Sequence, residues 1–420
     1  MTARDSVGWF VDTAGMTQQP VDSSLGRSLS LSALTDPAAV RAAAARHDEL
    51  GLADFLTEYG FKPPDQYWVV VEDRLYPAKA LAGIAIGFQH PGHGPLPHTR
   101  FSGGVVGANR ALERVGFSVL DSRPTAVEGE LRWRLALWRH LQATSVDGLL
   151  TPATLRAMGV YGGAQGIWID LNRTKSIDPN GVAVAVLHTG ARYAEDLDES
   201  GVIYHYPDTA RGPARDAREI AAMKAASELG LPLFVITSPT PTSAQRRVRL
   251  GWITDGDDDN RAFLITFAET APSRVQWDDH SDDEPFAAFG NRSRRVGRTV
   301  QHRPDQQAFK FKVLRRYGAR CPLSGVTVPQ MLEAAHLIPD SQGGSSDPRN
   351  GLVLNAALHR AFDAGLFAIN PDTLTIETLP AGPTLQDMGI HTPTLTALPH
   401  RPAPEALRWR YQQWTTTPTS

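Results

Sequence analysis

Two histidines, an asparagine and an aspartate follow one another near the end of the sequence, at His336, Asn350, His359 and Asp363. An imidazole titrates near neutral pH, so His336 can take a proton from a water molecule. An imidazole and a carboxylate together can hold a hard divalent cation, which neutralises the charge that grows on a phosphate under attack. These residue types therefore favour the hydrolysis of a phosphodiester bond, with His336 as the base.

The local sequence predicts how these groups are held. The segment EAAHLIP predicts a strand that ends at His336. Asn355 can cap a helix and Gly365 can end it, so His359 and Asp363, four residues apart, would project from one helix face. We expect His359 and Asp363 to share one ion, and the oxygen ligand favours Mg²⁺ or Mn²⁺ over a soft metal.

Residues 321–369 resemble the HNH nucleases, and more closely the HNH domains of modification-dependent restriction enzymes of the McrA type. The resemblance is carried by His336 in EAAHLIP, Asn350 in NGLVL, and His359 with Asp363 in HRAFDAG. The first three follow the family's order, at intervals of fourteen and nine residues. The resemblance implies a ββα-metal fold, a catalytic set of His336, Asn350 and His359, and a metal held by His359 and Asp363. It also implies that Asn350 ties the loop between the two strands by hydrogen bonds to the backbone.

One metal position departs from this family. Many HNH nucleases have an Asp or His ligand directly before the base, and this chain has Ala335 there. Asp363 is our choice for the second ligand, although its carboxylate could instead accept hydrogen bonds from the C-terminal tail. Glu333 is expected to be structural, and Cys321, the only cysteine, is expected to be a small buried residue.

Residues 159–269 resemble SRA domains, which read modified cytosines, in the segments ARYAEDLDESGVIYHYP, RDAREIAAMKAA, LPLFVIT and RRVRLGWIT. The resemblance implies a PUA-like curled β-barrel that flips a base out of DNA. Tyr193 and Tyr206 would hold the flipped cytosine by stacking, and Asp196 would bond its Watson-Crick edge. Tyr204 competes with Tyr206 for this role, Lys224 stands where the family usually has Asn, and tyrosines on strands are more often packing residues.

The order of helical and strand patterns predicts an α+β protein of three domains. We expect an N-terminal α/β head module at residues 1–124, the SRA-like reader at 125–275, a linker at 276–305, and the nuclease domain with its tail at 306–420. The head segments FLTEYGF, YPAKALAG, FSGG and RVGFSV resemble an N-terminal module found in some of the same restriction proteins.

The formal net charge of -3 hides an uneven distribution of charge. Ten Lys or Arg residues and one acid lie between residues 292 and 320, and the stretch before them is acidic. A local cationic run can bind phosphates while the total charge stays near neutral. No apolar run approaches the ~18 residues of a membrane span, and the N-terminus has no secretory signal. We therefore expect a cytoplasmic protein with no membrane partner.

Our leading hypothesis is a type IV-like restriction endonuclease that cuts double-stranded DNA carrying modified cytosine, either 5-methyl or 5-hydroxymethyl, through a one-metal HNH site. One alternative is a reader of modified DNA with a weakened nuclease, which Ala335 favours. Another is a non-selective or mobile-element HNH nuclease whose middle domain only positions DNA. Double-strand cleavage needs two active sites or one that acts twice, and a homodimer would supply two.

Overall fold

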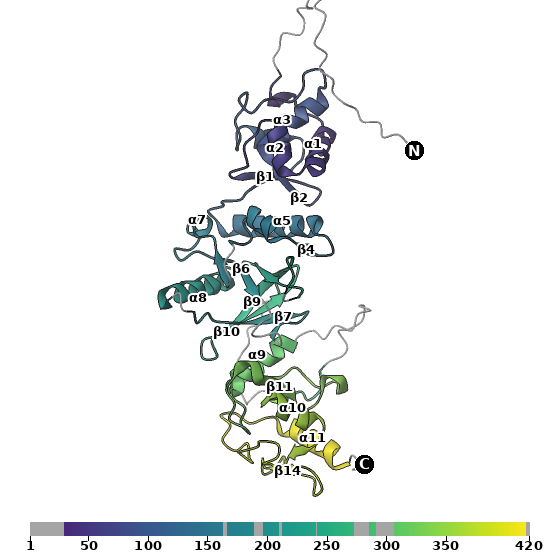
Figure 1. Ribbon diagram of the computed structural model, residues 1–420, viewed down its shortest axis with the longest axis vertical. Helices are drawn as coiled ribbons and strands as arrows, with labels where there is room; N and C mark the ends of the chain where they lie inside the picture. The colour runs from purple at the N-terminus through teal and green to yellow at the C-terminus, as the bar shows by residue number, and fades with distance from the viewer. Residues whose placement is uncertain are drawn as a thin grey trace, which may run out of the picture. The chain divides into compact units, whose positions relative to one another are not determined.

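The computed structural model describes residues 29–162, 166–188, 196–209, 212–240, 242–272, 285–290 and 306–416 (Figure 1). Its contacts divide the chain into two compact units. The head unit comprises Met1–Asp65 and Pro77–Val119, and the main unit comprises Gln66–Tyr76 and Leu120–Ser420. The head therefore ends near residue 119, five residues before the predicted boundary, and the predicted reader and nuclease domains form one unit.

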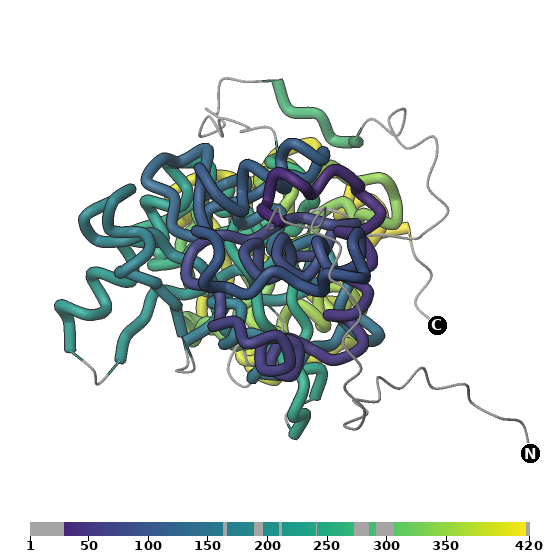
Figure 2. The backbone as a smooth tube through the Cα atoms, turned by 90° about the horizontal axis from the view of Figure 1, so that it is seen from above, coloured from purple at the N-terminus to yellow at the C-terminus, as the bar shows by residue number. Residues whose placement is uncertain are grey.

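The head unit is mostly helical. Its elements are η1 (Leu31–Ala33), α1 (Pro37–Leu50), α2 (Leu52–Glu58), α3 (Ala78–Gln89) and α4 (Ala108–Arg114). Asp36 caps α1 by accepting a hydrogen bond of 2.8 Å from the Ala38 N–H. Gly51 has a φ of 78°, which separates α1 from α2. The apolar helix α3 is largely buried in this unit, and α1 packs against it; both belong to the purple to blue part of the tube in Figure 2.

The main unit begins with a short strand pair that the sequence predicts as part of the head. Strands β1 (Tyr67–Val71) and β2 (Arg74–Pro77) form a sheet of order β2-β1-β3, with β3 at Val119–Asp121. The rings of Trp68 and Trp133 lie 6.3 Å apart, and the Leu75 N–H donates to His140 Nδ1 at 3.1 Å. Trp133 and His140 lie on α5 (Val127–Thr144), so these contacts attach residues 66–76 to the main unit.

A mixed sheet of seven strands follows. Its strands are β4 (Leu149–Leu150), β5 (Ile167–Ile169), β6 (Ala183–His188), β7 (Gly201–His205), β8 (Leu233–Thr237), β9 (Arg246–Asp257) and β10 (Ala262–Phe267). They pair in the order β5-β6-β8-β9-β10-β7, with β4 on β9, and only β6 and β8 run parallel among these described pairs. The predicted barrel is not confirmed, because β5 and β7 lie at opposite ends of this order and no pairing among the described strands joins them.

Helices cover this sheet and close its core. They are α6 (Pro152–Ala157), α7 (Leu171–Thr174) and α8 (Pro213–Glu228), in addition to α5. The buried side of α8, with Ala222 and Met223, packs against Val186 and Val235 of the sheet. Gly230, with a φ of 62°, follows the end of α8.

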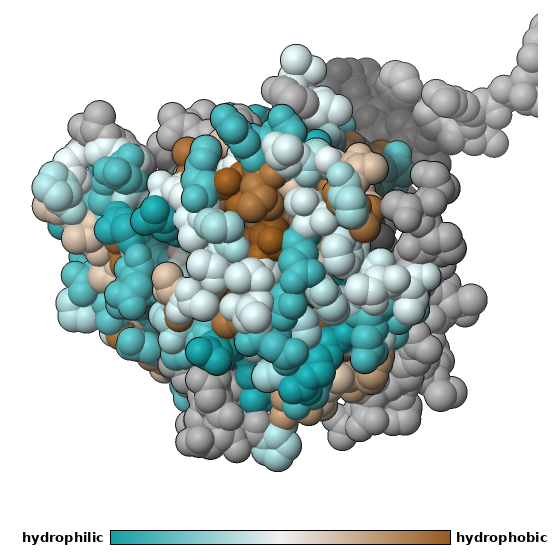
Figure 3. Space-filling view, turned by 90° about the horizontal axis from the view of Figure 1, so that it is seen from below, coloured by the Kyte–Doolittle hydropathy of each residue, from teal (hydrophilic) through white to brown (hydrophobic). Residues whose placement is uncertain are grey.

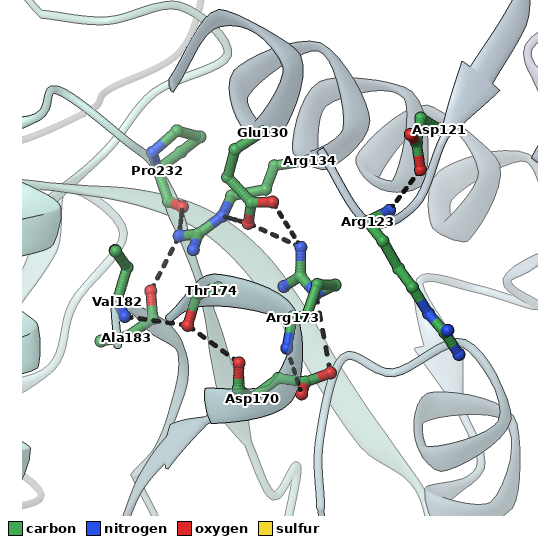
Figure 4. A network of polar contacts seen from close by, with 10 residues as sticks. All are labelled: Asp121, Arg123, Glu130, Arg134, Asp170, Arg173, Thr174, Val182, Ala183 and Pro232. Carbon is green, nitrogen blue, oxygen red and sulfur yellow. Dashed lines mark hydrogen bonds and ion pairs between the residues drawn. The ribbon is translucent and has the colours of Figure 1, made fainter. Parts of the chain in front are cut away.

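A buried polar network joins α5 to the sheet (Figure 4). The fully buried Arg134 donates to Glu130 at 2.6 Å and to the carbonyls of Ala183 at 2.8 Å and Pro232 at 2.6 Å. Arg173 of α7 donates to the same Glu130 carboxylate. Because both charges are out of water, removing one partner of such a pair typically costs about 3–5 kcal/mol.

The C-terminal part of the main unit has the predicted ββα arrangement. Its elements are α9 (Gln306–Tyr317), η4 (Pro329–Met331), β11 (Leu332–His336), η5 (Asp340–Gln342), η6 (Pro348–Asn350), β12 (Gly351–Asn355), α10 (Ala356–Asp363), β13 (Phe367–Ile369), β14 (Ile376–Thr378) and α11 (Pro404–Thr416). Strands β11 and β12 pair antiparallel, as do β13 and β14. Cys321 is fully buried in their core, as predicted.

Part of the predicted linker belongs to this fold. The Ser345 N–H donates to the Ala288 carbonyl at 3.1 Å, and the Gly290 N–H donates to the Gly343 carbonyl at 3.0 Å. Residues 285–290 are therefore docked, and only 276–284 and 291–305 of that linker lie outside the described residues. The first half of the basic run falls in this second gap.

The surface in Figure 3 is largely hydrophilic around a smaller apolar area. Among the described helices, none combines the length and the apolar character that crossing a bilayer requires.

Candidate functional site

The loop between β11 and β12 is held by Asn350. This residue is fully buried; its Oδ1 accepts from the Ile338 N–H at 2.9 Å, and its Nδ2 donates to the carbonyls of Ile338 at 3.0 Å and Ser345 at 2.9 Å. The predicted backbone role of Asn350 is thus confirmed by its hydrogen bonds. Gly344 is required here, since a Cβ would lie 1.9 Å from the Ile338 carbonyl oxygen. This loop fixes the direction of His336 at the end of β11.

Helix α10 presents the second histidine. Asn355 caps it, accepting from the Leu358 N–H at 2.9 Å, and Leu358 and Phe362 are buried in the core. His359 and Asp363 share the opposite side, with 3.4 Å between His359 Nε2 and Asp363 Oδ2. The predicted pairing of these two side chains on one helix face is therefore present.

Glu333 has a more specific place than the sequence suggests. Its Oε2 lies 2.6 Å from His359 Nδ1, so Nδ1 donates to the carboxylate. Such a contact fixes the tautomer and leaves the Nε2 lone pair for a metal. The register of β11 and β12 puts Glu333 opposite Leu354, and only this strand pairing brings it to α10.

Phe309 of α9 covers one face of His336. The two rings stack with centroids 3.7 Å apart and an angle of 11°. Burial lowers the pKa of His336 to about 4, with a further lowering by His359, while Asp340 and Asp363 oppose the shift. The ring is therefore neutral near pH 7 and can accept a proton. His359 and Asp363 thus lie close enough to His336 to act on its charge.

The donor atoms at this site suit a hard divalent ion. Within the described ranges, no group of three or more His, Cys, Asp or Glu side chains is arranged to hold a metal by itself. His359 Nε2 and Asp363 Oδ2 nevertheless have nearly the spacing of two neighbouring ligands, which lie roughly 3 Å apart around an octahedral ion such as Mg²⁺. The residue before the base, Ala335, is buried and supplies no ligand. Water and phosphate oxygens would have to complete the coordination.

The C-terminal tail also reaches Asp363. Arg410 of α11 lies with Nη2 3.3 Å from Asp363 Oδ1 and donates to the Phe362 carbonyl at 2.8 Å. Its guanidinium lies over the Phe362 ring, 4.4 Å from the centroid. Both sequence-based interpretations of Asp363 are compatible with this geometry, since Oδ1 faces the tail and Oδ2 faces His359. The sequence offers a contact between Asp363 and the tail as an alternative, but it does not identify Arg410 as the partner.

The predicted base-pocket residues are not assembled around an open pocket in the described structure. Tyr193 lies outside the described residues. Asp196 is only 2% exposed, and its carboxylate pairs with Lys310 Nζ at 2.6 Å and with His205 Nε2 at 2.8 Å. Both carboxylate oxygens therefore have partners inside the protein, and the expected contact of Asp196 with a base stays a prediction.

Tyr206 is likewise engaged within the protein. Its ring packs on Phe263, 4.6 Å between centroids, and its hydroxyl donates to Asp258 at 2.8 Å. Lys224, at the position where SRA domains usually have Asn, pairs with the same Asp258 at 2.8 Å. The competing residue Tyr204 is partly buried against the same core. The packing interpretation of Tyr206 therefore accounts for its observed contacts.

Three of the basic residues on and around α9 bind protein groups. Lys310 pairs with Asp196, Arg315 pairs with Asp255 at 3.0 Å, and Arg316 donates to the Arg401 carbonyl at 3.2 Å. These cations were expected to bind DNA phosphates. In the structure they hold α9 against the central sheet and the C-terminal tail.

Comparisons with protein families identify the two ends of the chain. Residues 32–121 match the family described as the ScoMcrA-like N-terminal head domain, and residues 321–370 match the family described as HNH endonuclease. The second match contains His336, Asn350, His359 and Asp363. No curated protein matches the chain at a significant level.

Two solved structures are similar to this chain at low levels. The modification-dependent TagI restriction endonuclease is 19% identical, with 64% of this chain and 92% of that chain covered and a TM-score of 0.27. The type IV phosphorothioation-dependent restriction endonuclease ScoMcrA is 13% identical, with 90% of this chain and 99% of that chain covered and a TM-score of 0.21.

Proposed function

We propose that this chain, a DNA endonuclease with an HNH domain and a ScoMcrA-like N-terminal head domain, is a modification-dependent restriction enzyme of type IV character. The observation that carries its catalytic part is the neutral imidazole of His336, held by Phe309 beside the His359–Asp363 pair.

In this proposal His336 takes the proton from the attacking water, because its imidazole is neutral and fixed at a strand end. Asn350 holds the loop that directs it. Glu333 orients His359, whose Nε2 would bind the ion together with Asp363. A Mg²⁺ or Mn²⁺ ion at that pair would neutralise charge on the phosphate and the leaving oxygen.

The test is cleavage of plasmid DNA by His336→Ala, with and without EDTA. We expect the variant to lose about 10²–10⁴-fold in cleavage rate, the usual contribution of a general base, with DNA binding retained. His391→Ala is the matched control, since His391 is an exposed histidine of the same domain. Full activity of His336→Ala, or of the wild type in EDTA, would contradict this mechanism.

We further propose that the central sheet and the loops around it read a modified cytosine, 5-methyl or 5-hydroxymethyl. The support is the resemblance of residues 159–269 to SRA domains together with the match of the head domain. Tyr193→Ala should erase the preference for modified over plain DNA, because the ring that would stack on the flipped base is lost. Cleavage of plain DNA should stay unchanged. Matched unmodified, methylated and hydroxymethylated duplexes measure this preference, with Tyr67→Ala as a control tyrosine of the main unit.

A second candidate is a non-selective HNH nuclease. The internal contacts of Asp196 and Tyr206 favour it, since both carboxylate oxygens of Asp196 are paired and the ring of Tyr206 packs on Phe263. Equal cleavage rates on the three duplexes by the wild type would favour this alternative and exclude dependence on 5-methyl- and 5-hydroxymethylcytosine.

A further inference from the structure

A cavity of about 300 Å³ lies in the main unit, between the second half of α5, the turn before β4 and the beginning of β9. Trp138 and Gln142 line it from α5, and Arg247 and Arg249 line it from β9. This volume is at the lower end of the range found for ligand sites. The residues that form it are not part of the HNH site.

The two arginines give the cavity a concentrated positive charge. They are the only charged residues among those that line it. They are two positions apart on β9, so their side chains start from the same side of the strand. Burial lowers the pKa of Arg249, and the neighbouring charge of Arg247 lowers it further, while Glu199 and Asp198 act in the opposite direction.

Glu199 and Asp198 act on the charge of Arg249, and no ion pair among the described residues joins either of them to it. In the part of the chain that the structure describes, neither guanidinium has a hydrogen bond to a carboxylate. Glu269 contacts two of the lining residues, and its two oxygens accept from Trp138 Nε1 at 2.7 Å and from Gln142 Nε2 at 3.4 Å. Arg249 is half-buried and Arg247 is exposed. Two like charges held close together attract an anion, and a guanidinium matches the oxygens of a phosphate.

We infer that this cavity binds a phosphate group of the DNA backbone through Arg247 and Arg249. The inference rests on the proposed function, which makes DNA the substrate. Backbone contacts of this kind position a duplex without reading its sequence. The site would therefore hold plain and modified DNA alike. It would supply phosphate contacts in place of Lys310 and Arg315 of α9, which are paired with carboxylates of the protein.

Salt-dependent DNA binding tests the inference. Binding of a plain duplex in EDTA would be measured for the wild type, Arg247→Gln and Arg247→Lys between 50 and 200 mM salt, the range over which phosphate contacts weaken strongly. We expect Arg247→Gln to bind about tenfold more weakly and to reduce the slope of log affinity against log salt by about 0.9, the value for one phosphate. Arg247→Lys keeps the charge and should retain the slope.

Arg218→Gln is the matched control, because Arg218 is an exposed arginine of α8 away from the cavity and its loss changes the net charge equally. If Arg247→Gln and Arg218→Gln have the same affinity and slope, the site is excluded. Inorganic phosphate is the second probe. If it stabilises the wild type against heat at millimolar concentration but not Arg247→Gln, while Arg247→Gln binds DNA as Arg218→Gln does, the cavity binds small anions and the assignment to DNA is wrong. A wild type that binds DNA but does not cut it would instead contradict the proposed function.

Discussion

At the scale of single residues, Phe309 controls the candidate base. Its ring lies flat on His336, and the resulting burial keeps the imidazole neutral well below pH 7. The sequence identifies the histidine because of its motif. It does not identify the phenylalanine, which lies in a basic segment 27 residues earlier and resembles ordinary helix packing.

Phe309→Ala should move the acid limb of the kcat/KM profile to higher pH. The unprotonated His336 is the active form, so activity is lost as pH falls through its pKa, which is about 4 in the wild type. Water admitted by the smaller side chain would raise the pKa towards the ordinary value of about 6.5. We therefore expect reduced activity of the variant at pH 5–6 and little change at pH 8. A bound cation would lower the pKa further and would not reverse the sign.

Phe311→Ala is the control for this profile, since Phe311 lies two residues further on and packs against the central sheet. It should reduce stability and leave the acid limb in place. An unchanged limb in Phe309→Ala, or the same shift in both variants, would contradict the role of the stacked ring.

At the scale of elements, α9 connects the central sheet to the nuclease core. Phe311 packs with Ile203 and Leu264 of the sheet, whereas Phe309 and Val313 pack in the nuclease core. Between them, Lys310 forms a buried ion pair with Asp196. Burial by itself would raise the pKa of Asp196, but the hydrogen bond from His205 and the charge of Lys310 outweigh it and lower the pKa.

Lys310→Met should destabilise the main unit by about 3–5 kcal/mol, because it leaves the Asp196 carboxylate buried without its cation. The double variant Lys310→Met/Asp196→Leu should recover much of this loss. Urea unfolding at pH 7 measures both. The lowered pKa of Asp196 also makes the stability depend on pH. The stabilisation is present above the usual pKa of Asp and is lost as pH falls through the lower pKa of the folded state.

Asp196→Asn separates the structural role from the base-reading role. We expect lower stability and an unchanged ratio of cleavage on modified and plain DNA. Unchanged stability together with a lost preference would show that Asp196 reads the base after all.

At the scale of the whole molecule, the division into units does not follow the order of the chain. Residues 66–76 interrupt the head unit in sequence and belong to the main unit through Trp68 and Leu75. A truncation designed from the sequence at residue 120 would therefore remove part of the main unit.

Deletion of residues 1–120 should lower the urea midpoint of the main unit, since α5 loses the cover of Trp68 over Trp133. The point variant Trp68→Ala in the full chain should show most of the same loss, about 3 kcal/mol for a buried tryptophan. Fluorescence-detected unfolding measures both. If the deletion leaves the midpoint unchanged, residues 66–76 do not stabilise the main unit.

The sequence by itself determined the catalytic motif and most elements. The cap at Asn355 and the face shared by His359 and Asp363 depend on spacing within one helix, which can be read from the sequence. The backbone role of Asn350 is implied by the resemblance to HNH nucleases. The strands of the central sheet and helix α8 also follow from local patterns, since apolar residues alternate in the strands and recur at helical spacing in α8.

Only the tertiary structure decided which distant groups meet. Glu333 reaches His359 through strand register, Phe309 reaches His336 through the packing of α9, and Lys310 takes the carboxylate of Asp196 from 114 residues away. These contacts depend on how helices and strands pack, and the type of a residue does not indicate which distant residue it will contact. Lys310 lies in the run that is predicted to bind DNA, and Asp196 is predicted to read the base. The packing of α9 brings these two residues together as an ion pair.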